Sequence, residues 1–358
     1  MSPASERSPL SVALVGARPA DDLGIEVAGD YGDPTAEWQA LRTTAGMFDR
    51  SSRGTVVVHG PDAQKFLQAL LSADVDALVD GTGTRTLFLT PQGRLDVEAR
   101  MLRVDTADGP EFWLDTDVGA AVRLATGLLR FRLRTKVDID DRTATFAQLG
   151  VRGPDATSSV SQALDVTVPD AIAAHAHVAW RGARVVRADW PDRAGVDVTG
   201  PVADVTAAWE ALLAHGVARA GLEAYEAARI EAGVPRLGPD LDERVLAHEA
   251  FLDRDAVSFT KGCFLGQEVV CRIDSRGRVN RFLRGLRVVG DEHPPVGSEV
   301  VVDDRVVGTL TSVAAPPDGG PVVALAYVRR EVEPPTTVTL RWDGGSATAD
   351  VRSVVAEV

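Results

Sequence analysis

Hydrophobic and polar residues follow one pattern up to about residue 280 and another beyond it. In the first part, apolar residues at helical spacing alternate with short apolar runs. This predicts helices at residues 34–41, 118–129, 202–215 and 225–232, and strands at 56–59, 87–89, 95–104 and 112–114. In the second part, Gly and Pro separate six short runs, at residues 286–289, 300–302, 306–310, 322–328, 337–342 and 347–351. The pattern therefore predicts an α+β region followed by an all-β barrel or sandwich.

A short internal repeat suggests that the α+β region is duplicated. The sequence Gly-Pro-Asp-Ala occurs at residues 60–63 and again at residues 153–156, each time between an apolar strand and a helical run. Four residues can recur by chance as the chemistry of a helix start. The matching strand–turn–helix context makes duplication the better interpretation.

The pattern divides the chain into four segments. Residues 1–20 are rich in Ser, Pro and Ala and are expected to be a loose terminus. Residues 21–235 contain the two α+β halves, residues 236–280 lose their periodicity and form a connection, and residues 281–358 form the β-domain. A ligand site near the junction at residue 280 is favoured, because binding sites often lie between domains.

Composition narrows the class of protein. The chain has 358 residues, of which 45% are hydrophobic and 25% are charged, with a net charge of −14. Such a surface repels nucleic-acid phosphates, and no membrane span or secretory signal is visible. Two cysteines give no disulfide framework, so a cytoplasmic location is expected. Residues 272–287 are rich in arginine and are therefore positively charged, unlike the chain as a whole. They fit either a solvated hairpin or an anion-binding patch.

Residues 261–268 carry the densest chemistry in the chain. They read Lys-Gly-Cys-Phe-Leu-Gly-Gln-Glu, with Cys263 between Gly262 and Gly266. Glycine allows close backbone approach, and a neighbouring cation such as Lys261 favours thiolate over thiol. The alternative is that both glycines are turn residues and the cysteine is a small core residue. A core strand has no use for Lys, Gln and Glu beside a thiol, so a site is favoured.

The same eight residues resemble the signature of the folate-binding YgfZ proteins, K-G-C-[YF]-x-G-Q-E. Residues 41–49 and 228–233 are similar to segments of the glycine-cleavage T-protein superfamily, to which YgfZ belongs. The resemblance implies two interlocked α+β domains that form a ring, followed by a C-terminal antiparallel β-barrel. It implies that tetrahydrofolate, or a one-carbon derivative, binds in the ring of a monomeric protein.

Two functions are compatible with this resemblance. YgfZ proteins are associated with assembly or repair of iron–sulfur clusters in client enzymes and with tRNA modification. In that reading, Cys263 is the reactive residue and Lys261 promotes its thiolate. The T-protein itself is an aminomethyltransferase. Iron–sulfur clusters commonly use four thiolates, so a chain with two cysteines holds no such cluster alone, and no metal site of its own is predicted.

An acidic pair helps to choose between the two functions. The T-protein places two successive acids on a strand at the folate, and residues 92–98 read Gln-Gly-Arg-Leu-Asp-Val-Glu here. Asp96 matches the first acid and Val97 falls at the second, while a shift of one residue would bring in Glu98. These departures favour the accessory function over aminomethyl transfer.

The resemblance also assigns folate contacts outside the motif. Arg229 matches a T-protein arginine near the folate, and Trp113 matches an aromatic residue that lines the channel. The alternatives are a surface arginine and a core aromatic residue. Gly262, Gly266, Gln267 and Glu268 are expected at the same ligand, although the last two side chains fit an ordering role in the loop equally well.

Overall fold

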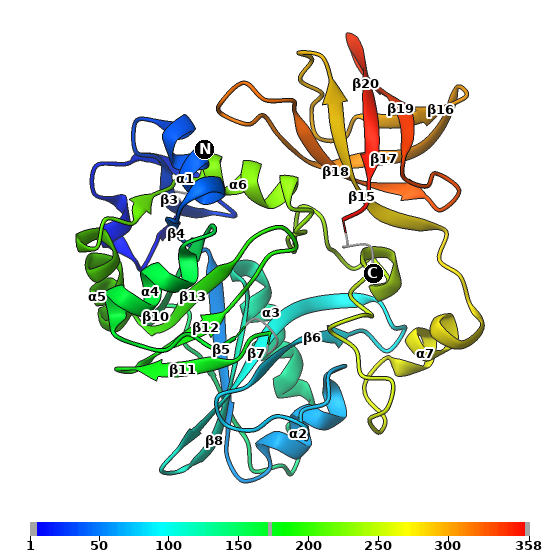
Figure 1. Cartoon of the computed structure of the whole chain (residues 1–358). Helices are drawn as coiled ribbons and strands as arrows, with labels where there is room; N and C mark the ends of the chain where they lie inside the picture. Colours follow the sequence, from blue (N-terminus) through cyan, green and yellow to red (C-terminus); the bar gives the residue numbers. More distant parts are fainter. Residues whose placement is uncertain (1–5, 171–173, 355–358) are drawn as a thin grey trace.

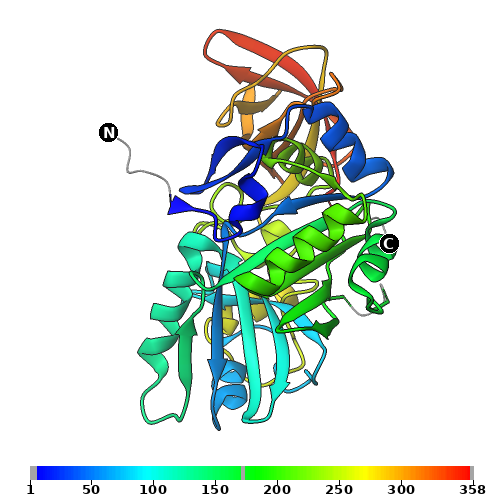
Figure 2. The same cartoon turned by 90° about the vertical axis from the view of Figure 1, so that its left-hand side faces the viewer.

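The computed structural model describes residues 6–170 and 174–354. Two layered α+β units lie side by side, and a β-barrel caps one end of them (Figures 1 and 2). The predicted α+β class and the C-terminal barrel are confirmed. In the described part of the chain, no helix is long and apolar enough to span a membrane.

The first unit is a five-stranded sheet covered on one face by two helices. Its strand order is β6-β7-β8-β5-β9, and all its pairings are antiparallel. The strands are β5 (Arg53–His59), β6 (Gly83–Leu89), β7 (Leu95–Thr106), β8 (Gly109–Asp117) and β9 (Asp138–Asp141). The helices are α2 (Ala63–Leu70) and α3 (Val118–Phe131). Their apolar sides form one core with alternate residues of the strands.

The second unit repeats this order of elements. Its sheet runs β11-β12-β13-β10-β4-β14. The strands are β4 (Gly46–Asp49), β10 (Phe146–Arg152), β11 (His177–Trp180), β12 (Ala183–Arg187), β13 (Gly195–Pro201) and β14 (Ala218–Arg219), and the helices are α4 (Ala156–Leu164) and α5 (Val202–Ala214). Strand β4 precedes the first unit in the sequence but pairs within the second. The two units are therefore interlocked.

The two copies of Gly-Pro-Asp-Ala make the same turn. Gly60 follows β5 with a φ of 109°, and Gly153 follows β10 with a φ of 129°. In both copies the glycine carbonyl accepts a hydrogen bond, at 3.1 Å, from the alanine N–H that begins the helix. A Cβ on either glycine would lie within 3 Å of a carbonyl oxygen, so both turns require glycine. The shared geometry supports the predicted duplication.

The N-terminal segment is more ordered than the sequence predicted. Strands β1 (Glu6–Arg7), β2 (Arg18–Asp22) and β3 (Ile25–Asp30) form a small sheet, and a 3-10 helix, η1 (Ser11–Leu14), lies between the first two. Leu10 and Ala13 are fully buried in the core of the second unit. The expectation of a loose terminus therefore fails for residues 6–20, because these apolar side chains anchor the segment. Residues 1–5 lie outside the described residues.

The remaining elements join the units to the barrel. Helices α1 (Pro34–Thr43) and α6 (Leu222–Glu231) pack against each other, and the connecting segment contains η2 (Ala247–Ala250) and α7 (Gln267–Arg276). All six predicted strands are present in a closed antiparallel barrel. They are β15 (Arg281–Val289), β16 (Glu299–Val302), β17 (Arg305–Ala314), β18 (Val323–Arg329), β19 (Thr336–Trp342) and β20 (Gly345–Arg352).

The helix-free faces of the two sheets meet in the middle of the molecule. In β7, residues 95, 97, 99 and 101 belong to the core with α2 and α3, so Arg100 and Leu102 point the other way. In β13, residues 196 and 198 belong to the core with α5, so Asp197 points away from that helix. Part of the meeting face is apolar, where Trp113, Leu102 and Val186 share a cluster. The rest is strongly charged.

Candidate functional site

The loop of residues 261–268 is docked on the turn between β6 and β7. Gly266 has a φ of 79°, and a Cβ there would lie 2.4 Å from the carbonyl oxygen of Thr90. Gly93, in the same turn, also lies close to Gly266, since a Cβ on Gly93 would lie 3.0 Å from the Gly266 carbonyl oxygen. Gly266 is therefore required by the docking. Gly262 has open space around it and Cys263 is exposed.

Lys261 anchors this loop to the end of α2. Its Nζ donates to three backbone carbonyls, at 2.8, 2.7 and 2.7 Å, those of Gln68, Leu71 and Ala73. Burial lowers the pKa of Lys261 to about 8, although Asp74 and Asp76 oppose the shift. All three ammonium hydrogens are used by carbonyls. The structure therefore shows that Lys261 anchors the loop, while its expected effect on the Cys263 thiol stays a prediction.

Gln267 and Glu268 have different partners within the protein. The Gln267 Oε1 accepts a hydrogen bond from the Phe264 N–H at 3.3 Å, so this amide orders the loop. The Glu268 side chain is 84% exposed and pairs with Arg272, one helical turn along α7, at 2.6 Å. The ordering role, which was the alternative interpretation of the sequence, describes Gln267. Glu268 lies on the solvent side of α7.

The two candidate acids lie on β7 and both have cationic neighbours. Glu98 is buried and pairs with Arg85 at 3.0 Å, and the same arginine pairs with Asp255 of the connecting segment at 2.9 Å. Asp96 lies at the start of the strand, 3.7 Å from the Arg123 Nε of α3, with 35% of its side chain exposed. Val97, at the position of the second T-protein acid, is fully buried in the apolar core. Asp96 is thus the more accessible acid.

Arg229 is a structural hub. It is 1% exposed, and all five of its N–H groups have protein acceptors. Nε and Nη2 donate to Glu226, Nη1 donates to Asp240 and to the Val234 carbonyl, and Nη2 also donates to Ser312 of the barrel. No donor remains for a folate. The family-based assignment is corrected: Arg229 joins α6 to β17.

Trp113 is also a core residue. Its ring lies edge-on to Phe146 at a centroid distance of 5.0 Å, and Arg184 covers it at 5.3 Å. Its indole N–H donates to Glu111 at 2.8 Å. The ring is buried between the two sheets, so it has no free face on which a pterin stacks. The core interpretation holds for Trp113.

A buried network of charges, which sequence reasoning missed, crosses from one sheet to the other. Arg100 of β7 donates to Asp115 of β8 and to Asp197 of β13, both at 2.6 Å. Arg152 of β10 donates to the second oxygen of Asp197 at 2.8 Å. Arg53 donates to Asp115 at 2.8 Å. In the sequence, these residues could be noticed only as charged residues at alternate positions of strands that are otherwise apolar.

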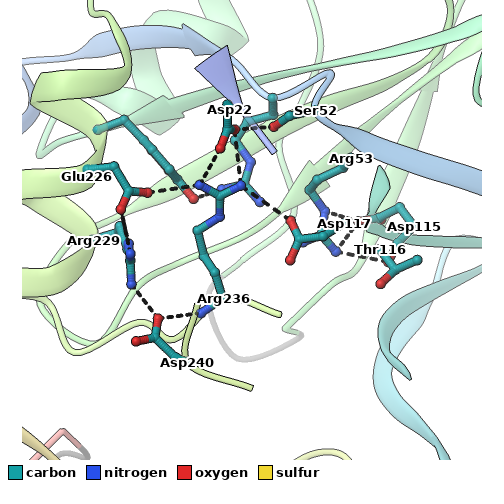
Figure 3. Close-up of polar contacts among 12 residues, drawn as sticks. Asp22, Ser52, Arg53, Asp115, Thr116, Asp117, Glu226, Arg229, Arg236 and Asp240 are labelled. Atoms are coloured by element: carbon teal, nitrogen blue, oxygen red, sulfur yellow. Dashed lines mark hydrogen bonds and ion pairs between the residues drawn. The ribbon is translucent and has the colours of Figure 1, made fainter. Parts of the chain in front are cut away.

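The network continues through Arg236 to Glu226 and Arg229 of α6 (Figure 3). Arg236 donates to Asp22 at 2.8 Å and to Glu226 at 3.0 Å, and it lies 3.6 Å from Asp117. Burial opposes the charged form, but Tyr225 and these three carboxylates raise the pKa of Arg236 well above its ordinary value. Through Glu226 the network reaches the Arg229 hub. Buried ion pairs therefore join the N-terminal sheet to both units, and hydrogen bonds of Ser312 with Arg229 and Asp240 join the barrel to this network.

Three aromatic rings lie beside this network. Phe48 lies 4.8 Å from Tyr225 and 6.3 Å from Trp190 between ring centroids. Arg152 lies over the Trp190 ring at 4.9 Å, and Arg50 lies over Tyr225 at 4.9 Å and donates to its hydroxyl. Flat rings with guanidinium groups are surfaces on which heterocycles stack and anions bind.

Several buried polar atoms at the same place have no partner among the described residues. Gln148 is 1% exposed, yet neither its Oε1 nor its Nε2 is hydrogen-bonded. Thr199, opposite Gln148 in the register of β10 and β13, has an unpartnered hydroxyl. The Arg152 Nε and the Arg100 Nη2 are also unpartnered. Buried polar groups almost always have partners, so this cluster fits a polar ligand or bound water.

Comparisons with known proteins agree with the geometry. Residues 13–261 match the family model of the GCVT N-terminal domain. The aminomethyltransferase of Rubrobacter xylanophilus is 32% identical over 338 residues, covering 91% of this chain and 87% of the relative. That of Listeria monocytogenes is 26% identical, covering 88% and 87%.

A solved structure shares the fold. The glycine cleavage system aminomethyltransferase T from Bartonella henselae aligns with a TM-score of 0.84 at 23% identity, covering 98% of this chain and 97% of that chain. The expected T-protein-like fold is thereby confirmed. The chain belongs to the GCVT N-terminal domain family, within the glycine-cleavage T-protein superfamily.

Proposed function

We propose that this protein binds tetrahydrofolate between its two sheets and uses it in one-carbon transfer of the aminomethyltransferase type. The observation that carries the proposal is the cluster of unpartnered polar atoms on Gln148, Thr199, Arg100 and Arg152 beside three aromatic rings. The names of the relatives support the reaction class. They favour it over the accessory function that the sequence motif suggested.

The residues at this place suit a reduced folate. A pterin has a flat face and an edge of hydrogen-bond donors and acceptors. The Gln148 amide and the Thr199 hydroxyl offer both donors and acceptors, and Arg50 and Arg152 offer cations for carboxylate groups. In this proposal Gln148 and Thr199 bind the ring edge, and Trp190, whose side chain is half-buried, borders its face.

Tetrahydrofolate as substrate supplies the amine that accepts the one-carbon unit. The chain must then supply a group that holds or moves the amine proton. Asp96 suits this role better than Glu98, because Glu98 is buried and held by Arg85 at 3.0 Å. Asp96 is half-exposed and has its nearest cation at 3.7 Å.

A folate-dependent assay tests this reaction. An aminomethyl donor, the protein and tetrahydrofolate should yield methylenetetrahydrofolate, and Asp96→Asn should lower the rate at least about 100-fold, within the range of general acid–base effects. The matched control is Asp108→Asn, in the exposed turn between β7 and β8. Full activity of Asp96→Asn would refute this role, and no turnover in the wild type would refute the reaction.

A second candidate is an accessory function of YgfZ type in assembly or repair of iron–sulfur clusters in client enzymes. The observation in its favour is Cys263, an exposed thiol in a loop that Lys261 and Gly266 fix in place. It predicts that Cys263→Ala fails to restore iron–sulfur enzyme activity or tRNA methylthiolation in deficient cells. The control is Cys271→Ala, because Cys271 is a free, half-buried cysteine in α7. This variant should restore both the iron–sulfur enzyme activity and the tRNA methylthiolation.

A further inference from the structure

The outer surface of α3 and the turn after it are apolar and basic. Residues 118–137 contain four arginines and one lysine but no aspartate or glutamate, in a chain whose acidic side chains outnumber the basic ones by 52 to 38. Helix α3 covers the outer face of the first sheet, and Figure 2 shows the turn after this teal helix at the end of the molecule opposite the barrel. The surface is therefore separate from the proposed folate site between the sheets.

Large apolar side chains are exposed along one side of this segment. They are Val122 (59% exposed), Leu129 (47%), Phe131 (41%) and Leu133 (84%). Val122 and Leu129 are about two helical turns apart and share one side of α3, while Leu124 and Leu128 are buried in the core on the other side. A surface helix normally carries polar residues on its solvent side. Neighbouring exposed apolar residues mark interaction sites, unlike single scattered ones.

Most cations of the α3 tip, which we define as residues 129–136, have no ion pair. Arg132 pairs with Asp138 at 3.3 Å, and 47% of this arginine side chain stays exposed. The other three cations are exposed and form no ion pair with a carboxylate in residues 6–170 and 174–354: Arg130, Arg134 and Lys136. Their charge is available to an anionic surface.

Carboxylates near the α3 tip are few. Asp62 accepts a hydrogen bond from the backbone N–H of Lys136 at 2.8 Å. Along β9, Asp140 is paired with Arg142 at 2.8 Å. The acidic turn between β7 and β8 lies two strand spacings from β9, at least about 10 Å away. Charges at that distance are largely screened, because the Debye length is about 8 Å at physiological ionic strength. The tip is therefore locally positive on a protein whose net charge is −14.

A lipid bilayer suits this surface better than a folded protein does. Ten residues between 122 and 136 are exposed, whereas a stable protein interface uses about 20–30 residues on each side. A bilayer sets no such minimum, because apolar side chains enter the boundary between headgroups and acyl chains one by one. Cations beside them add attraction to anionic lipids. Exposed apolar and basic residues on one helix are typical of membrane-surface segments.

We propose that the α3 tip binds the anionic surface of a lipid bilayer, with Leu129 and Leu133 among the acyl-chain ends of the headgroups and the unpaired cations on lipid phosphates. Such a contact is peripheral and reversible, and it requires no helix that spans the membrane. It is independent of the proposed folate site and is measurable without any activity assay.

Cosedimentation of the full chain with lipid vesicles tests the proposal. Vesicles of phosphatidylcholine and phosphatidylglycerol in equal parts should bind the protein at about 0.1 M salt, and vesicles of phosphatidylcholine alone should bind it at least about tenfold more weakly. Arg134→Ala with Lys136→Ala should weaken binding to the anionic vesicles at least about tenfold, because each cation near such a surface adds to the attraction. The control pair, Arg287→Ala with Arg305→Ala, removes the same charge from exposed arginines of the barrel and should leave binding unchanged.

A second pair of variants tests the apolar contact. Leu129→Ser with Leu133→Ser should weaken binding to the anionic vesicles at least about tenfold. The melting temperature should stay nearly unchanged, because both side chains are exposed. The matched control is Val289→Ser with Val306→Ser in the barrel, where the two side chains are 54% and 47% exposed. It should bind the vesicles as the wild type does.

Four results would overturn the proposal. Absence of binding to the anionic vesicles would leave a protein partner as the occupant of the α3 tip. Equal binding to both kinds of vesicle, or equal weakening by a control pair, would exclude a specific contact of the tip with anionic lipid. Self-association of the wild type without vesicles, abolished by Leu129→Ser with Leu133→Ser, would assign the tip to a second copy of the chain.

Discussion

Asp197 of β13 accepts a hydrogen bond from Arg100 of β7 at 2.6 Å, and this buried contact joins the facing sides of the two sheets. Burial alone would raise the pKa of Asp197, but Arg152, Arg100 and Arg50 hold it well below its ordinary value. The carboxylate therefore stays charged between the units. The ion pairs of Asp197 with Arg100 and Arg152 form a charged frame between the two sheets. The side-chain amide of Gln148 and the hydroxyl of Thr199 lie beside this frame without a hydrogen-bond partner among the described residues.

Replacing Asp197 by Ala should destabilise the protein by about 3–5 kcal/mol, because it leaves buried guanidinium groups without a partner. Glu299→Ala, in the exposed barrel pair with Arg341 at 2.8 Å, is the control. It should cost no more than about 1 kcal/mol. Urea denaturation measures both values, and equal losses would contradict the structural role of the frame.

Two glycines of the eight-residue motif should respond differently to the same change. Gly266→Ala places a Cβ against the Thr90 carbonyl at a positive φ, and should cost more than about 1 kcal/mol. Gly262→Ala meets open space and should be nearly neutral. Thermal unfolding compares the two variants. A neutral Gly266→Ala would show that the loop is not docked on the β6–β7 turn.

Lys261→Met should destabilise the end of α2 and leave Cys263 as reactive as before. The substitution leaves three carbonyls without their shared donor, at a cost of about 1–3 kcal/mol. The rate of alkylation by iodoacetamide, measured in a Cys271→Ser background, should change less than about twofold. Lys65→Met, on α2, is the control for stability. A tenfold slower alkylation would restore Lys261 as the activator of the thiol.

His177 should make the free energy of unfolding decrease as the pH is lowered from about 6.5 to about 4. Burial lowers its pKa to about 4, although the Arg103 carbonyl, 3.0 Å from Nε2, opposes the shift. The unfolded chain takes up a proton near pH 6.5 and the folded chain does not, so acid favours unfolding by up to about 3 kcal/mol. His177→Asn should lose less stability than the wild type between pH 7 and pH 4.5.

The control for this pH dependence is His215→Asn, since His215 is exposed at the end of α5. It should keep the slope of the wild type in denaturation curves across the same pH range. Identical slopes in all three proteins would exclude His177 as the titrating group.

Local patterns predicted elements well where burial is periodic. The six barrel strands are short apolar runs or alternate apolar and polar residues, and the sequence placed all six. Helix α7 was missed because only Val270 is buried within it, so its arginines gave the appearance of a solvated hairpin. The N-terminal sheet was missed because Leu10 and Ala13 find their core in a segment far along the chain.

Site residues were harder to predict because their partners are distant in sequence. The motif predicted a site at Cys263, which stays a prediction, and the structure shows this thiol to be exposed. The motif said nothing of the α2 carbonyls, about 190 residues away, that hold Lys261. Arg229 was assigned to the folate from its place in the family, but Asp240 and Ser312 occupy its donors. The Arg100–Asp197 pair joins two sheets, and no local pattern predicts such a contact.

The central claim is that tetrahydrofolate binds at the unpartnered polar groups between the sheets, and Gln148→Leu tests it most directly. Because neither side-chain atom of Gln148 has a partner, an apolar residue of similar size should leave the fold intact. Gln39→Leu, on the exposed face of α1, is the matched control. Calorimetric titration with tetrahydrofolate should show at least tenfold weaker binding for Gln148→Leu and unchanged binding for the control. Equal affinity of Gln148→Leu and wild type, at equal melting temperatures, would contradict the proposed site.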